Sequence, residues 1–188
     1  MQYLYHYYEK EVGPFVSLSD LDLEEAKHIQ QQLKKRGKTF AAERSDDYLE
    51  RRRYLEQLVR SKFVQKGGQP VRQTPHYMVL DECPWLESWY EEAAYIKIPV
   101  KEFNMRSVSF TYGDTFPTFS PIVTDGLEYR KQVYTYDEIL ERVIKYGLPQ
   151  HNSSNSSMFA QPRYVEAQVW DDAPIHQYVD LSAVKRRG

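Results

Sequence analysis

One carboxylate stands where it could do chemistry. Glu166 lies in the segment YVEAQVW, residues 164–170, which is rich in residues that favour β-strands. Because the side chains of a strand alternate between its two faces, Glu166 shares a face with two large aromatic residues, Tyr164 and Trp170. The pattern leaves two interpretations. Glu166 faces solvent, or it is a ligand-facing carboxylate that holds a ribose hydroxyl or stabilises a developing positive charge.

A polar loop leads directly into this strand. Asn and Ser dominate residues 150–161, a composition that favours no fixed conformation. Beside a catalytic carboxylate, such a loop could become ordered on binding and recognise a substrate. We therefore expect substrate contacts from four polar side chains, Gln150, Asn152, Asn155 and Arg163. The alternative is an ordinary surface loop.

A histidine lies near the other end of the chain, in an aromatic strand. Tyr5-His6-Tyr7 is part of the run YLYHYY, which predicts a strand. An imidazole there could donate a hydrogen bond to a sugar hydroxyl, and the neighbouring tyrosines could stack on a planar ligand. The same residues also suit a partly buried histidine with a structural role. The functional interpretation requires His6 and Glu166 to meet in the fold, although 160 residues separate them.

Tyr112 is a further candidate for ligand binding. It ends the strand-like segment 107–112, just before a turn formed by Gly113 and Asp114. Loops at strand ends often carry function, because the sheet fixes their ends. A tight turn with a packed aromatic cluster explains the same residues equally well.

Several common chemistries lack their motifs in this sequence. His76, Asp81, Glu82 and Cys83 match no zinc-ligand spacing, and the chain has a single cysteine, so no metal site is expected. The sequence contains no P-loop, no GxGxxG and no GxSxG motif. These absences argue against the usual nucleotide, dinucleotide and hydrolase sites.

The composition limits the class of protein. The net charge of −2 argues against a general nucleic-acid coat or a polybasic membrane binder. One cysteine, no signal-peptide pattern at the start and no long apolar run predict a cytoplasmic protein without a membrane partner. Sixteen tyrosines offer large stacking faces with polar tips, which suit planar ligands and binding surfaces.

Three helices are predicted around these candidates. Asp22, with Glu three residues later, begins a helix that Gly37 ends. A second helix spans about 46–66, and a third begins at a capping box at Thr135 and ends before position 147. The three arginines 51–53 on the second helix are expected to form a solvated face.

Strand-like segments cover much of the second half of the chain: 76–80, 95–100, 107–112 and 164–170. We expect a single domain, residues 1–188, mainly helical over 20–66 and mainly β over 75–180. Helices that lead, strands that follow and one late helix give an α+β fold class.

Four short segments, taken in order, are similar to one family of transferases. Tyr5-His6-Tyr7 is similar to an early strand that carries a histidine, and residues 74–90 to a middle strand with an aromatic connection. FTYGD, residues 110–114, is similar to a strand that ends in a turn. YVEAQV after the Asn/Ser loop resembles the strand that carries a catalytic glutamate behind a substrate-recognition loop. Together they resemble ADP-ribosyltransferases, most of all the DarT type that modifies DNA.

The resemblance implies both a fold and an activity. The fold would be a split antiparallel β-sheet core with an N-terminal helical insert and one late helix. The activity would be NAD-dependent ADP-ribosyl transfer to a nucleic-acid or protein acceptor, with Glu166 stabilising the oxocarbenium-like ribose. NAD, as a substrate, would be bound by four residues: Tyr5, His6, Tyr7 and Tyr112. The alternative is a non-catalytic interaction module whose Tyr- and Trp-rich surface binds a protein or a nucleic acid.

Overall fold

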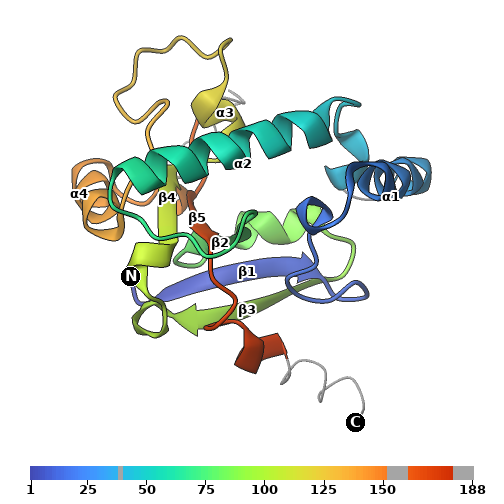
Figure 1. Ribbon diagram of the computed structural model, residues 1–188, viewed down its shortest axis with the longest axis horizontal. Helices are drawn as coiled ribbons and strands as arrows, with labels where there is room; N and C mark the ends of the chain where they lie inside the picture. The colour runs from blue at the N-terminus through green and yellow to red at the C-terminus, as the bar shows by residue number, and fades with distance from the viewer. Residues whose placement is uncertain (38–39, 152–160, 180–188) are drawn as a thin grey trace.

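One five-stranded antiparallel sheet organises the protein (Figure 1). The computed structural model describes residues 1–37, 40–151 and 161–179. The sheet has the strand order β3-β1-β2-β5-β4, and every neighbouring pair is antiparallel. Its strands are β1 (Tyr3–Glu9), β2 (His76–Leu80), β3 (Ala93–Pro99), β4 (Val108–Tyr112) and β5 (Val165–Val169).

The helices α1 (Leu23–Arg36), α2 (Tyr48–Gln65), α3 (Thr115–Phe119) and α4 (Tyr136–Tyr146) accompany the sheet. The sequence signals for α1 and α4 are confirmed. The side chain of Asp22 accepts a hydrogen bond from the Glu25 backbone N–H, and Thr135 and Glu138 form a capping box. Helices and an antiparallel sheet together confirm the α+β class. Within the described ranges, no helix is long and apolar enough to cross a membrane.

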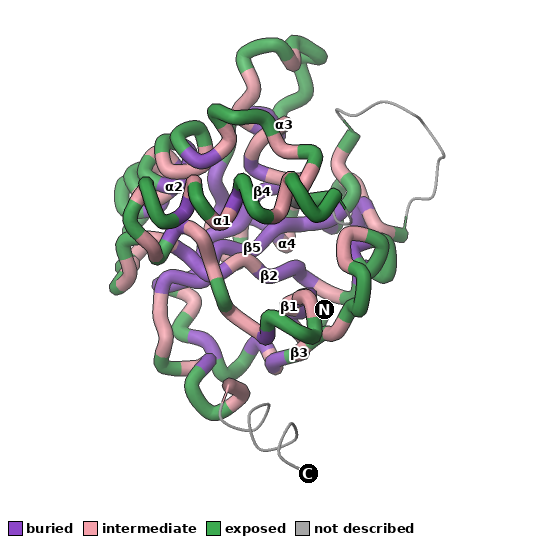
Figure 2. Tube along the Cα trace, turned by 90° about the vertical axis from the view of Figure 1, so that its right-hand side faces the viewer, coloured by how far each residue is buried: buried purple, intermediate pink, exposed green. Residues whose placement is uncertain are grey.

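The part of the sheet formed by β2, β4 and β5 is covered on both faces. One face packs against α4 through an apolar core that includes Phe110, Ala167 and Ile139. The other face is covered by α2, which lies across the strands in Figure 1 and contributes Val59 to a cluster with Trp170. The tube in Figure 2 shows the result, a buried centre formed by the strands. A side chain on β2, β4 or β5 is therefore in the interior whichever way it points.

The sheet is continuous, but the pair β3-β1 is joined to the other three strands, β2-β5-β4, by few backbone pairs. Strand β1 pairs with β3 over seven residues, and with β2 only at Leu4↔Leu80 and Tyr5↔Val79. Beyond Tyr5, the His6 side chain rather than the β1 backbone bonds to the backbone of β2. The expected split is thus a narrow join inside one sheet, not a gap between two sheets.

Two details of the helices differ from the sequence-based expectation. The arginines 51–53 do not all face solvent, because the side chain of Arg52 is 13% exposed and pairs with Glu56. Residues 115–119 form the helix α3 where a turn-rich loop was expected. Five residues are too few to show a helical period, so hydrophobic periodicity could not indicate α3.

Candidate active site

Glu166 lies in the middle of β5, on the face toward α2 and α3. The residue is only 6% exposed, so the interpretation as a solvent-facing glutamate is wrong. Its Oε1 accepts a hydrogen bond from Thr115 Oγ1 and one of 2.9 Å from Gln168 Nε2. The aliphatic residues of β5 face the opposite core, as the alternation predicted. The sequence pattern therefore identified the face correctly, but not its burial.

A second carboxylate, Asp114, enters the same interior from the start of α3. Asp114 is the N-cap of that helix, with Oδ1 accepting from the Phe116 backbone N–H at 2.7 Å. Its Oδ2 accepts from the Tyr164 hydroxyl at 2.9 Å. The turn before it depends on Gly113, which has a φ of 108°, a value that favours glycine. Strand β4, this turn and the cap together bring Asp114 to β5.

Burial perturbs both carboxylates. Burial, with a further contribution from the negative charge of Asp114, raises the pKa of Glu166 to about 8. Hydrogen bonds from Thr115 and Gln168 and the charge of Arg52 act in the opposite direction. Burial also raises the pKa of Asp114. At neutral pH, therefore, Glu166 holds a proton. Burying a carboxyl group costs free energy, and a buried carboxyl group with a strongly raised pKa is typical of a functional site.

Hydrogen bonds between β4 and β5 fix the side chain of Gln168, which lies beside Glu166 on the same face of β5. Ser109 Oγ donates to Gln168 Oε1 at 2.8 Å, and Gln168 Nε2 reaches Thr111 Oγ1 at 3.1 Å. Trp170 Nε1 donates to Ser109 Oγ at 2.9 Å. Because both ends of the Gln168 amide are held, its bond to Glu166 holds that carboxylate in one position.

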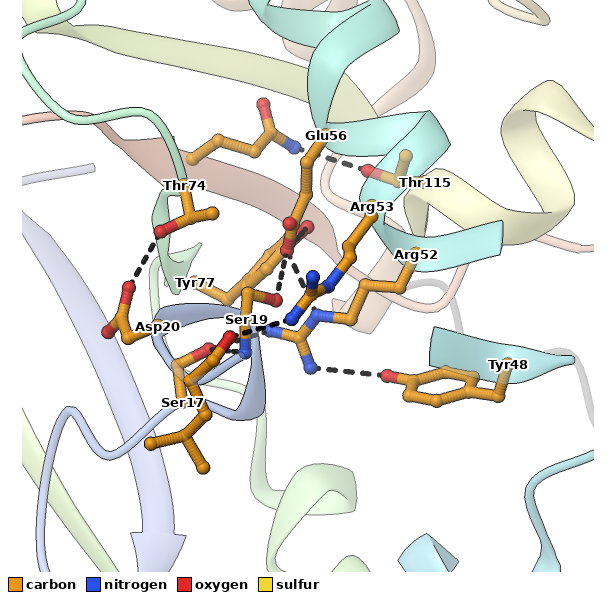
Figure 3. A network of polar contacts seen from close by, with 12 residues as sticks. Ser17, Ser19, Asp20, Tyr48, Arg52, Arg53, Glu56, Thr74, Tyr77 and Thr115 are labelled. Atoms are coloured by element: carbon orange, nitrogen blue, oxygen red, sulfur yellow. Dashed lines mark hydrogen bonds and ion pairs between the residues drawn. The ribbon is translucent and has the colours of Figure 1, made fainter. Parts of the chain in front are cut away.

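A cation lies on the α2 side of the same interior. Arg52 Nε is 3.0 Å from Glu56 Oε1, and its guanidinium lies 4.8 Å from the Tyr77 ring centre. The Tyr77 hydroxyl donates to the same Glu56 oxygen at 3.1 Å, and Ser19 Oγ donates to it at 2.7 Å. Figure 3 shows this network joining α2, β2 and the turn at Leu18–Asp20. Tyr77 pairs in register with Gln168, so the network adjoins the Glu166 side of the sheet.

Aromatic side chains adjoin Tyr164. Tyr5 and Tyr7 belong with Tyr164 to one buried cluster that also contains Cys83. Trp85 extends this group to the surface, since it is 40% exposed and its ring centre lies 6.4 Å from that of Tyr164. Trp89 stacks on Phe40 at 4.5 Å and meets Trp85 edge to face at 5.3 Å. We call Phe40, Trp85 and Trp89 the surface aromatic cluster.

The structure does not bring His6 to Glu166. In the sheet register, Tyr5 aligns with Val79 and Val79 with Glu166, so Tyr5 and Tyr7 share the face of Glu166. His6 points to the opposite face, where its ring lies 4.1 Å from that of Phe15. Both ring nitrogens are bonded to backbone, Nδ1 to Tyr77 O and Nε2 to Phe15 N, each at 2.9 Å. The meeting with Glu166 that a functional role for His6 requires therefore does not occur.

Tyr112 also faces away from Glu166. Its hydroxyl donates to the Gly147 carbonyl at 2.8 Å, and its ring packs against Tyr129 and Tyr146 in the α4 core. The strand parity explains this placement, because Tyr112 pairs with Val165 rather than with Glu166. Its partners belong to the core and not to the site.

The four loop candidates have different outcomes. Gln150 donates to the Leu80 carbonyl at 2.7 Å. Arg163 is exposed, with its guanidinium 4.8 Å from the Trp85 ring centre. Asn152 and Asn155 lie outside the described residues. Of the two described candidates, Arg163 is therefore the one that lies against the aromatic side chains around Tyr164.

The structure adds residues that the sequence did not single out: Tyr77, Asp114, Thr115, Gln168 and Arg52. A signal existed for Asp114, since an Asp directly after a strand and Gly is a good N-cap. Gln168 shares the strand face of Glu166 in the sequence pattern. Arg52 and Tyr77 could not be found without the sheet register. In the described part of the chain, no three His, Cys, Asp or Glu side chains are grouped to hold a metal ion.

Comparisons with known proteins identify no relative. The chain matches no family model, no curated protein and no solved structure.

Proposed function

We propose that the protein is a NAD-dependent ADP-ribosyltransferase with Glu166 as the catalytic carboxylate and a nucleic acid or a protein as the acceptor. The observation that supports the proposal is a pair of carboxylates, the buried Glu166 and the partly buried Asp114. Glu166 lies on the polar face of β5 and Asp114 at the N-cap of α3, among hydroxyl and amide groups, with the pKa of Glu166 raised to about 8. Burying a carboxylate lowers the stability of the fold, and proteins commonly accept such a loss at a catalytic site.

The chemistry needs an anion at the ribose carbon. When the bond between C1′ and the nicotinamide nitrogen breaks, its electron pair leaves with nicotinamide and positive charge develops on the ribose. Ionised Glu166 stabilises this charge, held in place by Thr115 and Gln168. The acceptor nucleophile then bonds to C1′, and its proton passes to Glu166.

The raised pKa gives this mechanism a pH dependence. The nicotinamide ring of NAD is a cation, whereas that of NADH is neutral. A cation beside Glu166 favours the ionised carboxylate, so NAD binding below pH 8 releases a proton. NAD should therefore bind more tightly as the pH rises toward 8, and NADH should not show this dependence.

The aromatic residues suggest how the substrate would be held. Tyr5 and Tyr7 lie on the Glu166 face of the sheet, in the cluster with Tyr164. Trp85 and Arg163 extend the cluster to the surface. In the proposal, these rings stack on the planar groups of NAD or of the acceptor. His6 and Tyr112 have no role in it.

Nicotinamide release from NAD tests the proposal directly. Wild type should release nicotinamide, and Glu166→Gln should lower the rate by at least about 100-fold while NAD still raises the melting temperature. Glu24→Gln is the matched control, since the Glu24 side chain is 88% exposed on α1, and it should match wild type. Added DNA, RNA or protein that accelerates release identifies the acceptor class. Equal rates in wild type and Glu166→Gln would exclude Glu166 as the catalytic group.

A second candidate function is a non-catalytic interaction module. The surface aromatic cluster favours it, because Phe40 and Trp85 are 42% and 40% exposed and such residues dominate binding hot spots. This function predicts no nicotinamide release and no change of melting temperature with NAD. The same two measurements therefore separate the two functions.

A further inference from the structure

A polar pocket lies on α2, and Glu166 is not among the residues that line it. It has a volume of about 600 Å³ and is bounded by α2, by Ser19 and by residues 73–74. Among the described residues that line it, all except Val64 have polar or charged side chains. The pocket is therefore built for a hydrophilic ligand rather than for an apolar one.

Glu56 forms part of the pocket wall with one oxygen saturated and the other unsatisfied. Oε1 accepts three hydrogen bonds, from Ser19, Arg52 and Tyr77, at 2.7, 3.0 and 3.1 Å. Oε2 is buried and has no hydrogen-bond partner among the described residues. The three bonds hold the carboxylate in place (Figure 3). A buried acceptor without a donor destabilises the fold, so Oε2 is suited to a donor that a ligand supplies.

Arg53, three residues before Glu56 on α2, has a donor that lacks an acceptor among the described residues. Its Nη2 donates to the Leu21 carbonyl at 2.6 Å, while its Nε is buried and has no acceptor within the described ranges. Positions three apart on a helix lie on the same side. The pocket wall thus holds one unsatisfied acceptor and one unsatisfied donor on the same side of α2.

These two atoms define the chemistry of the ligand. A simple anion would meet the Glu56 carboxylate, and a simple cation would meet Arg53 and Arg60, which also line the pocket. A hydroxyl group can both donate and accept, and two adjacent hydroxyls satisfy both atoms at once. Gln57 and Thr74 in the wall add amide and hydroxyl groups of the kind that bind further hydroxyls.

We propose that this pocket binds the vicinal diol of a sugar ring, with one hydroxyl donating to Glu56 Oε2 and the other accepting from Arg53 Nε. Both protein atoms are covered by their neighbours without ligand, so the diol reaches them by displacing the side chains that cover them. The proposal stands apart from the function of Glu166, because its ligand binds without reacting. The diol can belong to a free monosaccharide or to a nucleoside.

Calorimetric titration of the full chain distinguishes these sources. The ligands are D-glucose, D-ribose, adenosine, and 2′-deoxyadenosine, which lacks the diol. Gln57→Trp fills the pocket from an exposed position on α2, and Gln31→Trp is the matched control at an exposed position on α1. Glu56→Gln replaces the charged acceptor, and Glu166→Gln reports on the other site.

The proposal expects at least one diol ligand to bind wild type, Gln31→Trp and Glu166→Gln equally. Gln57→Trp should abolish this binding, and Glu56→Gln should weaken it about tenfold, because a charge-assisted hydrogen bond becomes a neutral one. Binding of adenosine alone assigns a nucleoside, and binding of the monosaccharides assigns a free sugar. No binding by any diol, equal binding of 2′-deoxyadenosine, or full binding by Gln57→Trp overturns the proposal. Loss in Glu166→Gln would also overturn it, by assigning the ligand to the Glu166 site.

Discussion

At the level of single residues, Glu166 is a group that the fold holds in an unfavourable state. An ordinary glutamate ionises well below neutral pH, whereas burial beside Asp114 raises the pKa of Glu166 to about 8. The folded chain must either keep a proton on Glu166 or bury a charge, and both cost free energy. Thr115 and Gln168 offset part of that cost.

This state predicts that Glu166→Gln stabilises the protein. Between pH 4.5 and 8, the folded state keeps a proton on Glu166 that the unfolded state has lost, so stability falls as the pH rises. Glutamine has no such proton. The gain in melting temperature of the variant over wild type should therefore be small at pH 5, grow to several degrees at pH 8 and then level off. Thermal melts at three pH values check this, and a gain that does not change with pH would contradict it.

His6 shows the opposite dependence on pH. Burial, with a smaller contribution from His76, lowers the pKa of His6 from 6.5 to about 4. The neutral ring accepts a hydrogen bond from Phe15 N at Nε2. The unfolded state binds the proton first, so stability should fall as the pH drops from 6.5 to 4, by about 3 kcal/mol in all. Urea unfolding at pH 7 and pH 4.5 measures the loss. His6→Gln removes the titration and should show a clearly smaller loss, while the remainder comes from His76 and the carboxylates.

At the level of elements, the short helix α3 connects the fold to the site. Its N-cap, Asp114, starts the helix and accepts a hydrogen bond from Tyr164, the residue before β5. The first residue of α3, Thr115, donates a hydrogen bond to Glu166 on β5. Asp114→Asn keeps a good N-cap but removes the charge. The pKa of Glu166 should then fall, because Asp114 is one of the causes that raise it.

The predicted effect of Asp114→Asn is a shift of the pH profile. In wild type, the stability penalty from Glu166 develops up to pH 8, and in Asp114→Asn it should end at lower pH. The pH at which half of this penalty has developed is the midpoint. It is measured from melting temperatures between pH 5 and 9, each compared with the same protein carrying Glu166→Gln. Asp114→Ala adds the loss of the cap, about 1 kcal/mol. An unchanged midpoint in Asp114→Asn would show that Asp114 does not act on Glu166.

The sequence predicted elements where local signals exist. Caps at Asp22 and Thr135 gave α1 and α4, and the alternation in residues 164–170 gave the correct faces of β5. Local signals could not give burial, because Glu166 is polar and its cover comes from α2 and α3. The same holds for Arg52, whose partner Tyr77 comes from β2.

At the level of the whole molecule, the parity of the sheet decides which candidates meet. Side chains alternate with a period of two, so a one-residue difference in register exchanges the two faces of a strand. Tyr5 and Tyr7 lie on the face of Glu166, and His6 does not. The sequence shows this alternation within each strand. It does not show how β1 aligns with β2, so the site could be predicted only in part.

The narrow join between β1 and β2 predicts two zones of backbone protection. Strand β1 is held by seven pairs to β3 but by two to β2, whereas β2, β5 and β4 pair along most of their lengths. Amides of β3 and the second half of β1 should therefore exchange with deuterium together, and at least about tenfold faster than those of β5. Hydrogen-exchange mass spectrometry with peptides covering residues 3–9 and 165–169 tests this. Equal protection in both zones would contradict it.

Chemical labelling of the single cysteine can measure how often the interior of the protein opens. Cys83 is fully buried in the cluster with Tyr7 and Tyr164, and burial raises its pKa to about 11. Alkylating reagents attack the exposed thiolate, so the folded state is nearly inert to them. Every labelled molecule has therefore opened at this cluster at least once. Because the chain has no other thiol, the rate of labelling counts those openings without any engineered probe.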